Sequence, residues 1–273
     1  MIYLCAISNI RSGSCNEDCK FCTQSAKNRA NIKRFKKKEI KDIINEAKIA
    51  RKYRASGFCL VTSGKELDED TLDYVIAATK AILKEVDISI IACNGLASYE
   101  MLKELKKAGV KIYNHNLESS KEFYKNLCTT HDWEDRFKTC QNVKKAGLRL
   151  CSGGIFGVGE SLEDIDSLIL SLKELDVDGI AINFFVPNKN LPITPQYDKS
   201  YAIEVINRFK KSFFDKILMI AGGRELIFKD IIEAINTGAN SVVIGDYLTT
   251  KGEKRSKDLE LLKKFNIKIA NEC

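Results

Sequence analysis

Residues 148–184 decide the fold, because they read as a strand, a helix and a second strand. They contain the segments LRLCS at 148–152, LEDIDSLILSLKEL at 162–175 and GIAINF at 179–184. The two short segments are mostly apolar, as in strands covered on both faces, and the longer segment has the apolar spacing of a helix. This order predicts a β-α-β unit with parallel strands.

The same alternation recurs along the chain about eight times. Further apolar runs lie at residues 2–8, 58–62, 88–92, 110–114, 217–220 and 241–244, and further helical segments at 39–53, 71–86, 99–108, 133–146, 201–209 and 230–237. The predicted fold is therefore α/β, a closed (β/α)8 TIM-type barrel that forms a single domain over residues 1–273. An open doubly wound sheet is the alternative. The stretch 187–195, which holds all three prolines, is predicted to be a long loop of the barrel.

The composition excludes several protein classes. With 273 residues, of which 44% are hydrophobic and 30% charged, the chain is neither disordered nor collagen-like, and it can form a core without disulfides. The net charge is a modest +7. The basic run Lys33–Lys38 has no recognisable nucleic-acid-binding module around it, so we expect a solvated helix flank and no nucleic-acid partner.

The ten cysteines are the unusual feature of the composition. The sequence shows no signal peptide and no run of membrane-spanning length, which predicts a cytoplasmic protein with no membrane partner. In that reducing compartment, cysteines serve as metal ligands or reactive groups more often than as disulfides.

A cysteine motif follows the first predicted strand. The stretch Ser14–Cys22 reads SCNEDCKFC, which is C-x3-C-x2-C. No fourth cysteine or histidine lies nearby, so one coordination position stays open. A structural zinc site needs four ligands, whereas a [4Fe–4S] cluster held by three cysteines keeps one iron available for a substrate or cofactor.

This motif, with an aromatic residue before its last cysteine, resembles that of the radical S-adenosylmethionine (SAM) superfamily. The resemblance implies that Cys15, Cys19 and Cys22 ligate a [4Fe–4S] cluster, whose fourth iron chelates the amino and carboxylate groups of SAM. It also implies that Phe21 lies near the adenine of SAM.

Three more cysteines, Cys59, Cys93 and Cys151, lie on separate predicted strands. Each one alone is most simply a buried, small apolar side chain. Together they could point into one lumen and build a second iron–sulfur site. Arg224 follows the seventh strand in the stretch AGGRE and could reach the same lumen, or it could bind an anion or cap a helix.

An ordered set of stretches resembles the biotin synthase family from about Leu4 to about Phe265. These stretches are YNHNLE at 113–118, CSGGIFGVGE at 151–160, AGGRE at 221–225 and LTT at 248–250. The resemblance implies a [2Fe–2S] cluster, ligated by Cys59, Cys93, Cys151 and Arg224, that donates sulfur to dethiobiotin to give biotin. It further implies an electron donor such as a flavodoxin or ferredoxin, and a homodimer.

The resemblance also assigns contacts with SAM and the substrate. Glu118 corresponds to an acidic position at the SAM ribose, and Ile155 to a residue that packs on the adenine. Asn116 and Asn183 correspond to contacts with the ureido ring or SAM. Thr249 and Thr250 correspond to residues near the substrate carboxylate. The alternatives are a plain turn at 114–116 and a tight glycine turn at 153–159.

Some positions depart from the family pattern. Glu118 stands for the commoner Asp, Phe21 stands for the usual Tyr, and the stretch LVTSG at 60–64 is unlike the family's. The chain begins almost at the first strand, without the helical extension that many members carry. The remaining cysteines match no family ligand and are expected to be structural or incidental: Cys5, Cys128, Cys140 and Cys273.

Other functions remain open at this point. Another radical SAM enzyme, such as a hydrogenase-cofactor maturase or an aminomutase-like enzyme, is the main alternative, and the three lumen cysteines together with Arg224 argue against it. A lipoyl synthase is disfavoured because no additional N-terminal cysteine triplet is present. A barrel with structural zinc, or a basic nucleic-acid-binding protein, is the alternative from another class.

Overall fold

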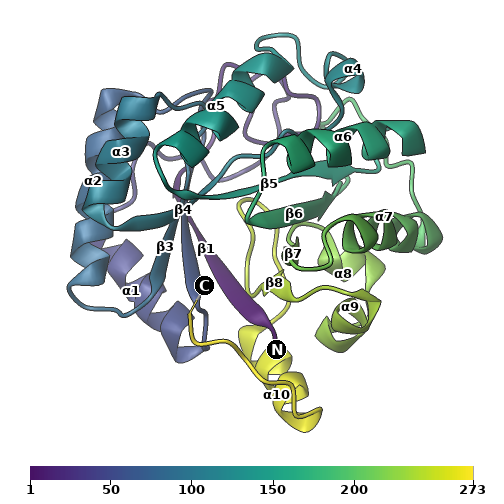
Figure 1. Ribbon diagram of the computed structural model, residues 1–273. Helices are drawn as coiled ribbons and strands as arrows, with labels where there is room; N and C mark the ends of the chain where they lie inside the picture. Colours follow the sequence, from purple (N-terminus) through teal and green to yellow (C-terminus); the bar gives the residue numbers. More distant parts are fainter. Residues whose placement is uncertain (273) are drawn as a thin grey trace.

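The computed structural model describes residues 1–272 and contains a closed barrel of eight parallel strands in chain order (Figure 1). The predicted (β/α)8 barrel is thereby confirmed, and the open sheet is wrong. The strands are β1 (Tyr3–Arg11), β2 (Gly57–Thr62), β3 (Ser89–Cys93), β4 (Val110–Asn114), β5 (Arg149–Phe156), β6 (Gly179–Phe184), β7 (Ile217–Ile220) and β8 (Ser241–Val243).

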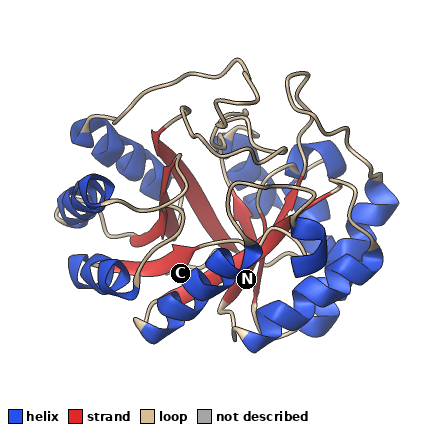
Figure 2. Ribbon diagram, turned by 90° about the horizontal axis from the view of Figure 1, so that it is seen from above, coloured by secondary structure: helices blue, strands red, loops and turns tan. Residues whose placement is uncertain are grey.

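Helices form an outer layer around this barrel (Figure 2). They are α1 (Ile40–Lys52), α2 (Glu69–Leu83), α3 (Tyr99–Ala108), α4 (Lys121–Tyr124), α5 (Trp133–Lys145), α6 (Leu162–Glu174), α7 (Lys199–Ser212), α8 (Arg224–Ile227), α9 (Ile231–Thr237) and α10 (Arg255–Lys264). The segments expected to be helical correspond to α1, α2, α3, α5, α6, α7 and α9. The sequence did not predict α4, α8 and α10.

Local sequence explains where the helices begin and end. The side chains of Ser98 and Ser161 accept hydrogen bonds from the backbone N–H groups of Met101 and Asp164, which caps the first turns of α3 and α6. At the other end of α3, Gly109 has a φ of 111°, in the left-handed region that glycine adopts without strain. These caps set the turns from which the next strands start.

Along each strand, successive side chains point alternately to the helices and to the lumen. The outward side chains pack with apolar helix residues into the main core, as Leu60, Ile90 and Val242 do. The inward side chains form a smaller apolar cluster that contains Cys59, Val61, Ile91 and Val243. This alternation places some cysteines in the lumen and leaves the C-terminal ends of the strands open to the loops.

Two long loops and the basic run complete the architecture. No named helix or strand lies between β1 and α1, or between β6 and α7, where the three prolines are. The run Lys33–Lys38 lies just before α1, as expected, and its last two lysines pair with Asp70 and Glu46. Among the described residues, no helix is long and apolar enough to cross a membrane.

Candidate active site

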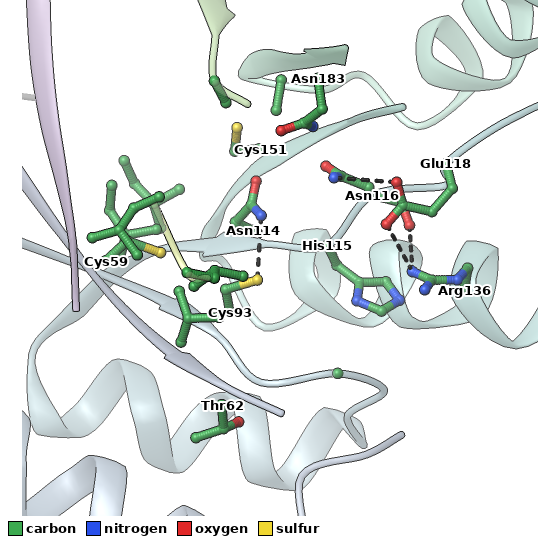
Figure 3. Close-up of a pocket in the computed structure, with 18 of the residues that line it drawn as sticks. Cys59, Thr62, Cys93, Asn114, His115, Asn116, Glu118, Arg136, Cys151 and Asn183 are labelled. Carbon is green, nitrogen blue, oxygen red and sulfur yellow. Dashed lines mark hydrogen bonds and ion pairs between the residues drawn. The ribbon is translucent and has the colours of Figure 1, made fainter. Parts of the chain in front are cut away.

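One cavity of about 330 Å³ runs from the loops at the C-terminal ends of the strands into the barrel lumen (Figure 3). Its lining includes Cys15, Cys19 and Cys22 of the β1–α1 loop, and also Cys59, Cys93 and Cys151 of the strands. The structure therefore brings both predicted sulfur sets to one cavity. This arrangement follows from the barrel, in which parallel strands deliver their C-terminal ends to one face.

Backbone and amide contacts shape the β1–α1 loop around its cysteines. The Cys15 N–H donates to the Gln24 carbonyl at 3.2 Å, and the Cys22 N–H donates to the Cys19 carbonyl at 3.1 Å. The Asn28 side-chain amide donates to the Cys19 and Cys22 carbonyls at 2.9 and 2.8 Å. These bonds fix the backbone of the loop at Cys15, Cys19 and Cys22, because a movement of the loop there would break them.

A fourth thiol, from outside the β1–α1 loop, lies against it. Cys128, which the sequence suggested was structural or incidental, has its Sγ 3.6 Å from the Cys19 Sγ and 3.3 Å from the His131 Nδ1. The same His131 nitrogen lies 2.6 Å from a Glu17 carboxylate oxygen. Hydrogen bonds from Cys19 and His131 lower the pKa of Cys128 well below its usual value. The spacing C-x2-H at 128–131 is the signal that could have identified this cluster.

The lumen thiols pack within an apolar cluster. Burial raises the pKa of Cys59 well above its usual value and raises that of Cys93 as well. The Asn114 side-chain amide donates to the Cys93 Sγ at 3.3 Å (Figure 3). Cys151 and two further sulfur-bearing residues, Cys5 and Met219, belong to the same lumen cluster.

Arg224 does not lie with the lumen cysteines, and the prediction that it reaches them is wrong. It begins α8 and is absent from the residues that line the cavity. Its guanidinium instead donates to both carboxylate oxygens of Asp258 on α10, at 3.1 and 2.8 Å. Both side chains are almost fully buried. This carboxylate holds the pKa of Arg224 above its usual value, so the group keeps its proton.

Asn114, His115, Asn116, Glu118 and Arg136 form a polar wall of the same cavity. The Glu118 carboxylate lies 3.9 Å from the Arg136 guanidinium, which donates to the Asn116 carbonyl at 2.7 Å. Burial raises the pKa of Glu118, and Arg136 opposes that shift. Glu118 has a φ of 71° and exchanges backbone hydrogen bonds with Gly153 and Ile155. Sequence reasoning missed Arg136, which lies four positions after the N-cap of α5.

Several buried polar atoms along this wall have no hydrogen-bond partner within the described chain. They include the side-chain oxygens of Asn114 and Asn116 and the Nε2 of His115. Buried acceptors of this kind are costly unless a ligand satisfies them. The wall therefore fits a polar ligand, and the two thiol sets of the same cavity fit iron–sulfur clusters, whose usual protein ligands are cysteine thiolates.

The remaining predicted contacts fall partly in the cavity wall and partly outside it: Phe21 lines the cavity, and Ile155 does not. Asn183 lines it, donating to the Gly154 carbonyl at 3.2 Å and accepting from the Gly222 N–H at 3.0 Å. Phe21 and Ile155 pack in one small apolar cluster. Thr249 and Thr250 are not among the lining residues, although the Thr249 hydroxyl lies 2.8 Å from that of Thr23 in the β1–α1 loop.

The other cysteines divide into different settings. Cys140 lies on α5 away from the cavity, with its Sγ 3.3 Å from the His115 carbonyl, which agrees with a structural role. Cys5, also expected to be structural or incidental, lies in the cavity wall. Cys273 lies outside the described residues.

Solved structures share the fold. The FeFe-hydrogenase maturase HydG from Carboxydothermus hydrogenoformans matches 98% of this chain and 67% of its own, with a TM-score of 0.85 and 18% identity. Methylornithine synthase matches 98% of this chain and 83% of its own, with a TM-score of 0.84 and 16% identity. At such identities the likeness concerns the fold alone.

Sequence comparisons are more specific. The radical SAM superfamily model matches residues 9–171, and the model of the Biotin and Thiamin Synthesis associated domain matches residues 181–268. Curated proteins named biotin synthase are 61% identical in Nautilia profundicola and 53% identical in Aliarcobacter butzleri, over the whole of this chain and 99% and 98% of theirs. The chain therefore belongs to the biotin synthase family within the radical SAM superfamily.

Proposed function

We propose that this chain inserts sulfur into dethiobiotin to make biotin, using SAM and two iron–sulfur clusters. The observation that carries the proposal is the single cavity that joins the Cys15–Cys22 loop to the cysteines of the lumen. A substrate held between the two sulfur sets is within reach of both. The curated relatives, which align over the whole chain, support the same reaction.

The three cysteines of the loop, Cys15, Cys19 and Cys22, would hold a [4Fe–4S] cluster with one position open to SAM. When bound, this cluster supplies the electron that splits SAM into methionine and a 5′-deoxyadenosyl radical, and a [2Fe–2S] cluster on the lumen cysteines supplies sulfur. The chain's own part is to fix the three thiols, which the bonds of Asn28 and Gln24 do.

The polar wall would orient SAM. The Glu118 carboxylate, held at this place by its backbone bonds to Gly153 and Ile155, can accept from the ribose hydroxyls. Phe21 and Ile155 supply an apolar surface for the adenine. The Arg136 guanidinium, also in the cavity wall, supplies the charge opposite to that of the SAM carboxylate.

The substrate would lie deeper, between the wall and the lumen. The unpartnered Asn116 oxygen is an acceptor for an N–H of the ureido ring. The Asn183 amide is already fixed by Gly154 and Gly222, so it presents its remaining N–H in one direction. We place Thr249 and Thr250 near the substrate carboxylate at the mouth, because Thr249 contacts the β1–α1 loop and Leu248 lines the cavity.

We also propose the finer properties that the family resemblance implies. The closed barrel, to which all eight strands contribute, supports a single domain over the chain. A cytoplasmic homodimer and a flavodoxin or ferredoxin as electron donor complete the proposal. The net charge of +7 would favour the approach of an acidic donor protein.

Anaerobic reconstitution tests the function. The protein is loaded with iron and sulfide, then given SAM, dithionite and dethiobiotin, and the products are measured by mass spectrometry. We expect both 5′-deoxyadenosine and biotin, and neither from Cys19→Ala, because two thiolates cannot hold the loop cluster. Formation of 5′-deoxyadenosine without biotin would show a different radical SAM activity.

A further inference from the structure

The fourth ligand of the lumen cluster is unassigned once Arg224 is removed from the lumen. Its guanidinium makes two bonds to Asp258, and the arginine side chain is only 2% exposed. Ligation through a guanidinium nitrogen requires loss of a proton, and the Asp258 carboxylate opposes that loss. Moving Arg224 to the lumen would also leave Asp258 buried without its partner.

Two other side chains carry sulfur into the same lumen. Cys5 of β1 and Met219 of β7 line the cavity and pack in the apolar cluster that contains Cys59, Cys93 and Cys151. Cys5 pairs with Gly57 in the β1–β2 register, so Cys59 lies two residues further along the adjacent strand and points to the same side. Cys5 and Cys151 come from alternate strands, which supply the side chains of one barrel layer.

The two candidates differ in chemistry. A thiolate is an anionic ligand that iron in sulfide clusters uses in almost every protein, and four cysteines are the ordinary ligand set of a [2Fe–2S] cluster. The Met219 thioether is neutral and donates weakly. We propose that Cys5 is the fourth ligand, so that the lumen site is Cys5, Cys59, Cys93 and Cys151, with Met219 packed beside it. This inference rests on the proposed function.

Ligation of Cys5 to iron would also prevent a side reaction of the substrate radical. A carbon radical readily takes hydrogen from an S–H bond, and Cys5 lies in the wall of the cavity where the substrate radical would form. Bound to iron, Cys5 has no S–H bond to offer. A thiol left at this position would instead return the substrate radical to dethiobiotin before sulfur is transferred.

The test compares variants of the full chain reconstituted with ⁵⁷Fe, by Mössbauer spectroscopy. Wild type should show [4Fe–4S] and [2Fe–2S] signals. We expect Cys5→Ala to lose the [2Fe–2S] signal and about a third of the iron, while it keeps the [4Fe–4S] signal and 5′-deoxyadenosine release. Cys5→Ser should keep a [2Fe–2S] cluster with an altered spectrum, because oxygen replaces one sulfur ligand.

Met219→Leu is the matched control in the same lumen, and it should keep the wild-type [2Fe–2S] spectrum. The proposal is overturned if Cys5→Ala retains that spectrum at full iron content, if only Met219→Leu loses it, or if pulsed EPR of the reduced cluster detects a directly bound nitrogen. Circular dichroism confirms that each variant is folded. A wild-type protein that forms no second cluster would instead refute the proposed function.

Discussion

At the scale of single residues, the Cys19 and Cys128 sulfurs are 3.6 Å apart, although 109 positions separate them in the chain. Small side-chain rotations would bring them to the length of a disulfide bond, about 2.05 Å. We predict that diamide, which accepts the two electrons and two protons released, joins these thiols in cluster-free protein. Peptide mapping by mass spectrometry should find the Cys19–Cys128 link.

Cluster loading provides the control for this disulfide. In loaded protein the Cys19 thiolate is bound to iron, so diamide should not form the link. The Cys128→Ser variant should not form it with or without the cluster. A link from Cys19 to Cys15 or Cys22 at equal yield would contradict the prediction, because it would show that the loop rearranges freely.

Cys151 and Cys140 provide a second comparison between single residues. Cys151 is on β5 and lines the cavity, whereas Cys140 is on the preceding helix α5 and does not line it. We predict that Cys151→Ala releases 5′-deoxyadenosine at near wild-type yield and forms no biotin, because only the lumen cluster is damaged. Cys140→Ala should form biotin, at a cost of about 1–2 kcal/mol in stability for a small cavity.

Biotin formation by Cys151→Ala at the wild-type yield would contradict the assignment and make Cys151 a structural thiol. Product per monomer in a single turnover is the measurement, since it removes effects on cluster repair.

At the scale of elements, α10 is attached to the barrel through a buried ion pair. Asp258, in the first turn of α10, pairs with Arg224 at the start of α8. We predict that Arg224→Ala destabilises the fold by about 3–5 kcal/mol, because it leaves a buried carboxylate unpaired. Urea unfolding measures the loss.

The double variant Arg224→Met with Asp258→Leu distinguishes an unpaired charge from a lost contact. It should recover most of the stability, because apolar residues of similar volume replace buried ion pairs at little cost. If Arg224 were a cluster ligand, the double variant would be as stable as expected but would lack the lumen cluster.

The strand β5 is tightly packed against the turn that carries Glu118. A Cβ on Gly154 would lie 2.7 Å from the Glu118 carbonyl oxygen and 2.9 Å from Leu168. We predict that Gly154→Ala displaces Glu118 and raises the KM for SAM several-fold, with both clusters still formed. Kinetics at varied SAM, with iron analysis, checks this. An unchanged KM would mean that Glu118 does not contact SAM.

At the scale of the whole molecule, the barrel could be predicted because its signal is periodic and local. Eight segments repeat the same apolar pattern, and the lumen position of Cys59, Cys93 and Cys151 follows from strand alternation. Arg224 could not be placed from sequence, because its direction depends on Asp258, which lies 34 positions away. The roles of Cys5 and Cys128 likewise depend on contacts between distant segments.

Cluster loading should change the pH dependence of the whole fold. In cluster-free protein, burial raises the pKa of Cys59 and Cys93 above the usual value of 9.0, so the folded chain keeps protons that the unfolded chain releases as pH passes 9. The fold therefore loses stability above that pH. Cluster-bound thiolates hold no proton, so loaded protein lacks this loss.

We therefore predict that the thermal unfolding midpoint of cluster-free protein falls between about pH 8.5 and 10.5 by more than that of loaded protein. Lysine and tyrosine ionisation affects both forms, so the difference between the two curves isolates the thiols. Cys59→Ala should remove the part of that difference that comes from the lumen thiols, because the lumen cluster does not form without this ligand, whereas Cys140→Ala, whose thiol binds no iron, should leave most of it. Parallel curves for loaded and cluster-free protein would show that the buried lumen thiols do not lose their protons to solvent when the clusters bind.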